Sequence, residues 1–242
     1  MINSIRNTAS IRKKKKSSEQ YESPSKKLGF SYAFIVYNIY KYIGGTIFMK
    51  YGTIEVICGP MFAGKTEELL RRVRRLEYAH KKVVLFKPQI DDRYDKSFIV
   101  SHNQNKALCV ALKNSEEMFN FVKDDTDCVV IDEFQFLGDE AVDIAINFSR
   151  RGIRVIVSGL DMDFRGEPFG NMPKILAIAD SVTKLTAICV KCGEPATRTQ
   201  RILDGKPAPY NSKQILVGAS EAYEARCASC FEIPGKTYKY DK

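Results

Sequence analysis

The feature that most constrains this chain is a segment fitting the pattern G-x-x-x-x-G-K-[ST], namely Gly59-Pro60-Met61-Phe62-Ala63-Gly64-Lys65-Thr66. An apolar run precedes it, and a stretch with helical periodicity follows. A strand, a glycine-rich turn and a helix in this order indicate a P-loop, whose backbone N–H groups and helix N-terminus surround phosphate oxygens. We expect Lys65 to neutralise charge on the β- and γ-phosphates and the Thr66 hydroxyl to bind Mg²⁺. The alternative, a chance match in a glycine turn, is disfavoured by the flanking elements.

A second segment supplies the carboxylate that a P-loop needs. Residues 128–132 are four apolar residues ending in Asp132, as in a Walker B strand, and Glu133 follows directly. We expect Asp132 to act on metal-bound water and Glu133 to activate a nucleophile as a general base. The alternative is that both carboxylates cap a helix beginning near Asp139. The residues alone leave open whether the nucleophile is water, as in an ATPase, or a substrate hydroxyl, as in a kinase.

Short apolar runs alternate with amphipathic stretches from residue 51 to about residue 189. Apolar strands that alternate with helices predict a parallel sheet covered on both faces. The predicted fold is therefore α/β, a RecA-like P-loop domain over residues 49–186 with helices on both faces. The expected strands are 53–58, 82–87, 128–132, 153–159 and 182–189, and the expected helices are 66–80, 115–122, 139–151 and 172–179.

Four of the seven cysteines form two C-x-x-C pairs, Cys189/Cys192 and Cys227/Cys230, with 34 residues between the pairs. Four thiolates in this pattern predict a tetrahedral Zn²⁺ site, and because no ligand position stays open the zinc should be structural. A redox-active pair is the competing interpretation. We expect a small zinc-binding domain over residues 187–242. The other cysteines, Cys58, Cys109 and Cys128, are expected to be buried in apolar strands.

The net charge of +9 is distributed unevenly along the 242 residues. Residues 1–48 hold nine basic and two acidic residues, or +7, whereas residues 49–242 hold 29 basic and 27 acidic residues, or +2. A nucleic-acid-binding protein needs a basic face on its folded body. The charge therefore predicts neither nucleic acid nor a membrane as a partner.

Residues 1–48 admit three interpretations. The favoured one is that translation starts at Met49, because Gly44-Gly45 can be encoded by a ribosome-binding sequence at a suitable distance. The second is a disordered leader, since residues 1–27 are rich in Ser, Lys and Asn. The third is a targeting or membrane segment, although the uncharged run 28–40 is shorter than the roughly 20 residues that a membrane span needs.

Four segments, GPMFAGKT, DEFQF, residues 159–170 and KLTAIC, together resemble the type II, zinc-containing thymidine kinases. The resemblance covers nearly all of residues 51–230 in the family's order and spacing. It implies transfer of the ATP γ-phosphoryl group to the 5′-hydroxyl of thymidine, and of deoxyuridine too, with Mg²⁺ and structural Zn²⁺. It also implies a cytoplasmic homotetramer inhibited by dTTP that salvages nucleotides for DNA synthesis.

The resemblance assigns roles to individual residues. Glu133 is the base that takes the 5′-hydroxyl proton, Thr66 and Asp132 hold Mg²⁺, and Lys65 and Arg93 stabilise the phosphates. The implied ATP site adds to the P-loop the residues Asp132, Glu133, Phe134 and Gln135. The implied thymine pocket consists of Met61, Phe136, Leu160, Phe164 and Phe169, with Leu216 and Tyr223 on a loop that closes over the base.

The chain departs from the family pattern at two places. Phe134 stands where a smaller residue is usual, and Ala219-Ser220 follow Gly218 where Gly-Gly is common. Zinc is expected to hold together both ends of residues 193–226, so its loss should loosen the loop over the thymine before the ATP-binding core unfolds. The alternative function is a RecA-like ATPase whose zinc ribbon acts on nucleic acid.

Overall fold

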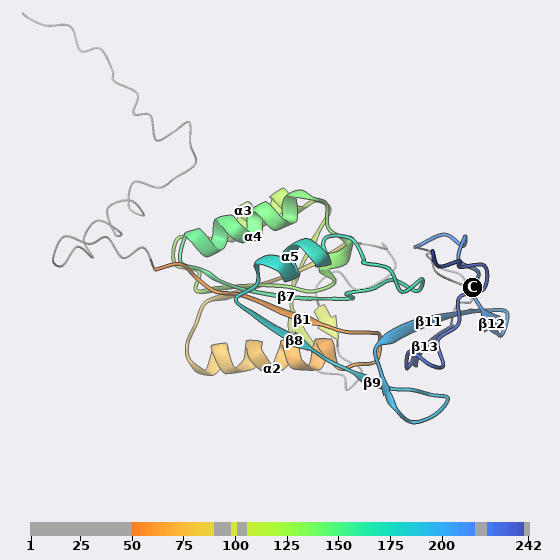
Figure 1. The fold of residues 1–242 in the computed structure, drawn as a ribbon. Coiled ribbons are helices and arrows are strands. Elements are labelled where there is room, and N and C mark those ends of the chain that lie inside the picture. Colours follow the sequence, from red (N-terminus) through yellow and green to blue (C-terminus); the bar gives the residue numbers. More distant parts are fainter. Residues whose placement is uncertain (1–49, 90–97, 101–105, 216–221, 240–242) are drawn as a thin grey trace, which may run out of the picture. The chain divides into compact units, whose positions relative to one another are not determined.

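The central sheet has six strands: β1 (Ile54–Cys58), β2 (Val83–Pro88), β5 (Val110–Leu112), β6 (Cys128–Ile131), β7 (Arg154–Gly159) and β8 (Ser181–Lys184). All paired strands are parallel, in the order β5-β2-β6-β7-β1-β8 (Figure 1). The computed structural model describes residues 50–89, 98–100, 106–215 and 222–239. Because only β7 separates β1 from β6, the P-loop and Asp132 emerge at the same edge of the sheet.

The helices follow the predicted positions closely. They are α2 (Lys65–Tyr78), α3 (Met118–Phe121), α4 (Glu140–Arg150) and α5 (Met172–Ile178), with 3₁₀ turns η2 (Ser115–Glu117) and η3 (Phe134–Phe136). The predicted helix over 115–122 is thus a 3₁₀ turn continued by one short helix. Since η3 lies between Glu133 and α4, the carboxylates Asp132 and Glu133 do not cap that helix.

Two hydrophobic cores lie on opposite faces of the sheet. Val56 and Cys58 of β1 belong to the core that holds residues of α3, α4 and α5, whereas Ile57 belongs to the core that holds residues of α2. Figure 1 shows α2 on one side of the sheet and α3, α4 and α5 on the other. This arrangement explains why the strands are apolar throughout, because both of their faces are buried. The predicted α/β fold is confirmed.

One predicted strand is wrong in its second half. Residues 182–189 do not form a single strand, because the chain leaves the sheet after Lys184 and Leu185 N donates the last bond to Cys58 O (2.8 Å). The segment resumes as β9 (Ala187–Ile188), which pairs with β10 (Pro195–Ala196) around the first cysteine pair. Three strands before β6 were also not predicted: the edge strand β5, and the antiparallel pair β3 (Phe98–Val100) and β4 (Lys106–Leu108).

The residues after β9 form antiparallel structure outside the central sheet. The strand β11 (Arg198–Leu203) pairs with β12 (Lys206–Pro207) and with β13 (Ala222–Arg226). The cysteine pairs follow β9 and β13, which brings their turns together. The division of the body between residues 186 and 187 stays a prediction.

The interpretations of residues 1–48 concern a segment outside the described residues. Among the helices that the structure describes, none is both long enough and apolar enough to cross a membrane. Cys58 and Cys128 are buried in strands as predicted. Cys109 is only half-buried and lies between β4 and β5, where the chain passes from one sheet to another.

Candidate active site

The P-loop joins β1 to α2 in a conformation that its glycines allow. Gly59 has a φ of +142°, and a Cβ atom there would lie 2.4 Å from the Leu185 carbonyl oxygen, so a side chain does not fit. Gly64 adopts the left-handed conformation at the start of α2. Lys65 Nζ donates a 2.7 Å hydrogen bond to the Pro60 carbonyl oxygen, so its ammonium group is turned toward the loop. The loop therefore offers backbone N–H groups, a helix N-terminus and a cation to an anion.

Asp132 and Glu133 follow β6 directly, beside the P-loop. Asp132 is 6% exposed, and the side chains of Ser158 and Thr66 lie close enough to it to lower its pKa in part. The structure thus brings together the two predicted Mg²⁺ ligands, Thr66 and Asp132. A hydroxyl and a carboxylate close together beside a P-loop fit the oxygen ligands that Mg²⁺ prefers. Glu133 N donates to Asp132 Oδ1 at 3.0 Å, which fixes the two consecutive carboxylates relative to each other.

Burial shifts the pKa values of Asp132, Glu133 and Lys65. Loss of solvent, reinforced by the Asp132 carboxylate, raises the pKa of Glu133 to about 7. Loss of solvent also raises the pKa of Asp132 and lowers the pKa of Lys65, while the carboxylates beside Lys65 oppose that lowering. A carboxyl group that titrates near neutral pH suits a general base. Glu133 is also held at φ +53°, a left-handed conformation that a residue with a side chain adopts at a cost.

Gln135 connects Glu133 with the segment after β7. Its Nε2 donates to Glu133 Oε2, and its Oε1 accepts from Leu160 N at 3.0 Å. The side chain is 4% exposed. Gly159 and Gly170 leave room for it, because Cβ atoms there would lie 2.6 Å from Gln135 Oε1 and 2.1 Å from its carbonyl oxygen. One buried amide therefore orients the predicted base against the predicted pocket.

Aromatic side chains from three segments lie near these groups. Phe136 and Phe169 form an edge-to-face pair with ring centroids 5.4 Å apart, and Phe164 is 4% exposed. Phe169 and Phe164 belong to a tight loop over residues 159–170, closed by the bridge between Met162 and Pro168. Leu160, Met61 and Tyr223 are partly buried. The predicted pocket residues in the described segments are thus positioned by the loop after β7, by η3, by the P-loop and by β13.

Other predicted site residues are placed differently. Phe134 is completely buried in the core on the α4 side of the sheet. Arg93 and Leu216 lie outside the described residues, so their predicted roles are not tested.

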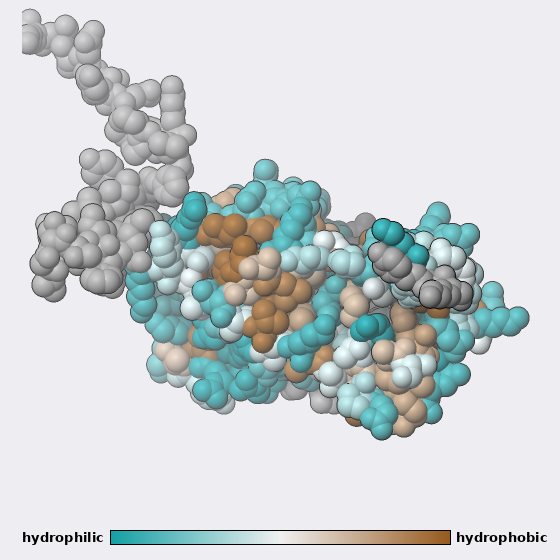
Figure 2. Space-filling view, viewed as in Figure 1, coloured by the Kyte–Doolittle hydropathy of each residue, from teal (hydrophilic) through white to brown (hydrophobic). Residues whose placement is uncertain are grey.

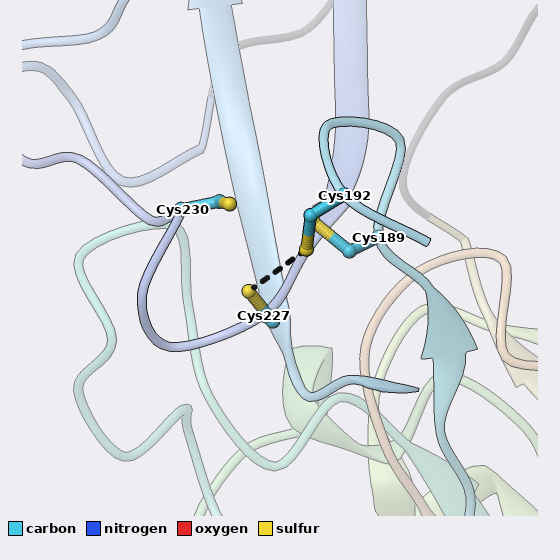
Figure 3. A group of neighbouring side chains, drawn as sticks. All are labelled: Cys189, Cys192, Cys227 and Cys230. Carbon is cyan, nitrogen blue, oxygen red and sulfur yellow. Dashed lines mark hydrogen bonds between the residues drawn. The ribbon is translucent and has the colours of Figure 1, made fainter. Parts of the chain in front are cut away.

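The four cysteines of the two C-x-x-C pairs converge in space. Their sulfur atoms all lie within 4.8 Å of one another, and Cys192 Sγ is 3.6 Å from Cys227 Sγ (Figure 3). A tetrahedral Zn²⁺ with Zn–S bonds of about 2.3 Å places its sulfurs about 3.8 Å apart. The cluster fits a zinc ion with four thiolate ligands, as predicted for a zinc ribbon.

The surroundings of the cysteine cluster pack against the P-loop. Ala63 of the P-loop, like Cys227 and Cys230, packs against a hydrophobic cluster formed by Ala187, Cys189, Ala196 and Ala225. Thr199 Oγ1 in β11 accepts a 3.0 Å hydrogen bond from Met61 N. The zinc site and the phosphate site are therefore parts of one packed structure.

Several residues of the site were not predicted from the sequence. Asp161 is buried, pairs with Lys184 at 2.8 Å and lies close enough to Lys65 to affect its pKa. Asp163 accepts hydrogen bonds from Arg165 N and Gln214 Nε2. The D-x-D spacing in a loop after a buried strand is the signal that would have found both carboxylates.

The fold and site define an α/β protein with a P-loop and a four-cysteine site beside that loop. The family model described as thymidine kinase matches residues 52–231, well over half of the chain. The chain therefore belongs to the thymidine kinase family. Membership makes it a kinase, and the family implies ATP and thymidine as substrates.

Proposed function

We propose that this chain transfers the γ-phosphoryl group of ATP to the 5′-hydroxyl of thymidine, and of deoxyuridine as a second acceptor. The products are ADP and the nucleoside 5′-monophosphate, in a cytoplasmic salvage reaction for DNA synthesis. The observation that carries the proposal is the placement of Glu133, a partly buried carboxyl group beside the P-loop that Gln135 connects to the pocket segment.

Each residue has a distinct part in the reaction. Glu133 takes the proton of the 5′-hydroxyl as its oxygen forms a bond to the γ-phosphorus, while the bond from the γ-phosphorus to the ADP oxygen breaks. The P-loop N–H groups and Lys65 hold the phosphate oxygens and offset their negative charge. Thr66 and Asp132 would hold Mg²⁺, which supplies further charge neutralisation when it is bound.

The pocket explains why a nucleoside rather than water would be the acceptor. Phe136, Phe164 and Phe169 offer apolar and aromatic surface for a planar base. A base seated on these rings places its sugar toward the carboxyl edge of the sheet, where Glu133 lies. An apolar pocket also excludes water, which disfavours ATP hydrolysis.

The test measures two products from one protein. Residues 49–242 are incubated with ATP and thymidine, and ADP and dTMP are quantified with and without nucleoside. We expect dTMP in proportion to ADP and little ADP without thymidine. Robust nucleoside-independent hydrolysis with no dTMP would overturn the proposal and favour the ATPase alternative.

Glu133→Gln provides the mechanistic arm of this experiment. Removing a general base typically costs about 10²–10⁴-fold in rate, so turnover should fall by that order while ATP binding persists. Asp139→Asn is the matched control, because Asp139 is an exposed carboxylate paired with Lys174 at the start of α4. Equal turnover in both variants would contradict the assignment of Glu133.

We further propose that the chain assembles as a homotetramer. The strand β8 is the last of the sheet, and within the described residues no strand pairs with its outer edge. Figure 2 shows apolar side chains gathered over α5 and the adjoining start of β8, where Ile178 and Val182 are 41% and 48% exposed. Exposed edge strands are normally covered, and a second copy of the chain supplies a matching edge.

A further inference from the structure

Arg201 is the bulkiest fully buried side chain in the described part of the chain, with 2% of its surface exposed. It lies in the middle of β11, directly opposite Tyr223 of β13. Burying a guanidinium group costs free energy unless its donors are satisfied in good geometry. The groups that Arg201 contacts therefore indicate what it is for.

Its donors connect two separated parts of the chain. Nη1 donates to the Lys213 carbonyl oxygen at 2.5 Å, and Nη2 donates to the Gln214 carbonyl oxygen at 2.8 Å. Nε and Nη2 also donate to the Tyr223 hydroxyl oxygen, at 3.1 and 2.9 Å. The guanidinium group thus fixes the main chain at residues 213–214 relative to a side chain of β13.

The same group lies against the predicted base pocket. The Arg201 guanidinium carbon is 4.1 Å from the centroid of the Phe164 ring, within the range of a cation–π contact. Phe164 belongs to the loop that also carries Asp163, which binds the Gln214 side chain at 2.9 Å. The main-chain carbonyl of Gln214 is therefore held by Arg201, and its side-chain amide is held by Asp163 of the pocket loop.

We propose that Arg201 is a positioning residue for the nucleoside site, which sets nucleoside affinity by fixing Tyr223 and Phe164 relative to each other. This inference rests on the proposed function. Arginine suits the task because its planar fork donates in several fixed directions while its face lies on a ring. A lysine ammonium group is a single point charge and cannot serve two carbonyls, a hydroxyl and an aromatic face together.

The experiment compares Arg201→Lys, Tyr223→Phe and the double variant. Thymidine and ATP dissociation constants are measured by calorimetry, and kcat at saturating thymidine by dTMP formation. For Arg201→Lys we expect thymidine affinity to fall roughly 10- to 100-fold, as for lost charge-assisted hydrogen bonds, with the ATP constant within about twofold of the wild type. Saturating kcat should stay within a few-fold.

Tyr223→Phe removes the hydroxyl acceptor and keeps the ring. We expect a smaller loss of thymidine affinity, and a double variant that is hardly weaker than Arg201→Lys alone, because contacting partners are not additive. Arg198→Lys is the control, since Arg198 lies on the same strand and bonds its neighbour Thr197. It should bind thymidine as the wild type does.

The outcomes separate this inference from the proposed function. If wild-type protein binds no thymidine, the proposed function fails. If it binds thymidine and both Arg201→Lys and Tyr223→Phe bind it equally well, only the role of Arg201 fails. A purely structural role would lower ATP and thymidine affinity together. Should Arg201→Lys not fold, a wild-type thymidine affinity in Tyr223→Phe alone would overturn the inference.

Discussion

The main-chain N–H of Met61 in the P-loop donates a 3.0 Å hydrogen bond to Thr199 Oγ1, 138 positions later in the chain. Through this bond, β11 lies against the P-loop and supports its main chain. Thr199 is 4% exposed, so water has little access to its hydroxyl group as an alternative partner. The conformation of the P-loop therefore depends on a strand that precedes the second cysteine pair.

Thr199→Val should weaken ATP binding. Valine keeps the shape and removes the acceptor, and an unsatisfied buried N–H costs about 1–3 kcal/mol. If roughly half of that cost is felt in the bound state, ATP affinity falls by about 2- to 12-fold. Thr199→Ser is the matched control, because it retains the hydroxyl. Calorimetric titration with a non-hydrolysable ATP analogue checks both, and equal affinities would show that the bond does not support the loop.

Removal of zinc should affect both substrates. From the sequence, zinc loss is expected to loosen the thymidine side first. In the structure, Ala63 of the P-loop packs against the hydrophobic cluster that includes Cys189. We therefore expect Cys227→Ser, or chelation, to weaken ATP binding as well as thymidine binding.

Fluorescence titration of ATP against protein of measured zinc content tests this. Cys109→Ser is the control, because Cys109 lies between β4 and β5, outside the cluster. Zinc-free protein that binds ATP with unchanged affinity would contradict the coupling.

Acid should destabilise the fold through Glu68 on α2. Hydrogen bonds from Arg71 and then Arg72 lower the pKa of Glu68 to about 2. A carboxyl group whose pKa is depressed on folding contributes stability above its unfolded value, near 4.3, and loses it as the pH falls toward 2. Because Arg71 is exposed, we expect about 1 kcal/mol rather than the full value of the shift.

Urea unfolding of Glu68→Gln at pH 7 and pH 3 measures this contribution. The variant should be less stable than wild type at pH 7, and the difference should shrink at pH 3. Glu67→Gln, in the same turn of α2, serves as the control. A difference that is the same at both pH values would exclude the ion pairs as its source.

Charge placed on the edge strand should prevent assembly. Val182 of β8 lies in the apolar surface over α5, and a lysine there would bring like charges together across a symmetric contact. We expect Val182→Lys to reduce the mass measured by light scattering after size exclusion. Ile188→Lys is the control, because Ile188 is 67% exposed on β9, away from the central sheet. Unchanged mass in Val182→Lys would place the interface elsewhere.

The parts of the site that could be predicted are those formed by residues close together in the sequence. The P-loop, Asp132 with Glu133 and the cysteine pairs are contiguous motifs, and the structure places each group together. The strand β5 was missed because three residues at a sheet edge carry too little pattern to identify. Thr199, Arg201 and Gln214 were missed because their partners lie far away in sequence, and only the folded chain brings them together.

A substitution of Gln135 should distinguish a role in positioning Glu133 from a role in binding ATP. The family resemblance puts it among the ATP-site residues, whereas the structure joins its amide to Glu133 and to Leu160 N. Gln135→Met fills the same space without either bond. If the amide positions the base, kcat falls about tenfold or more while the ATP dissociation constant and the melting temperature change little, since small displacements of a catalytic group are costly. If Gln135 binds ATP instead, the variant loses ATP affinity and keeps its saturating kcat.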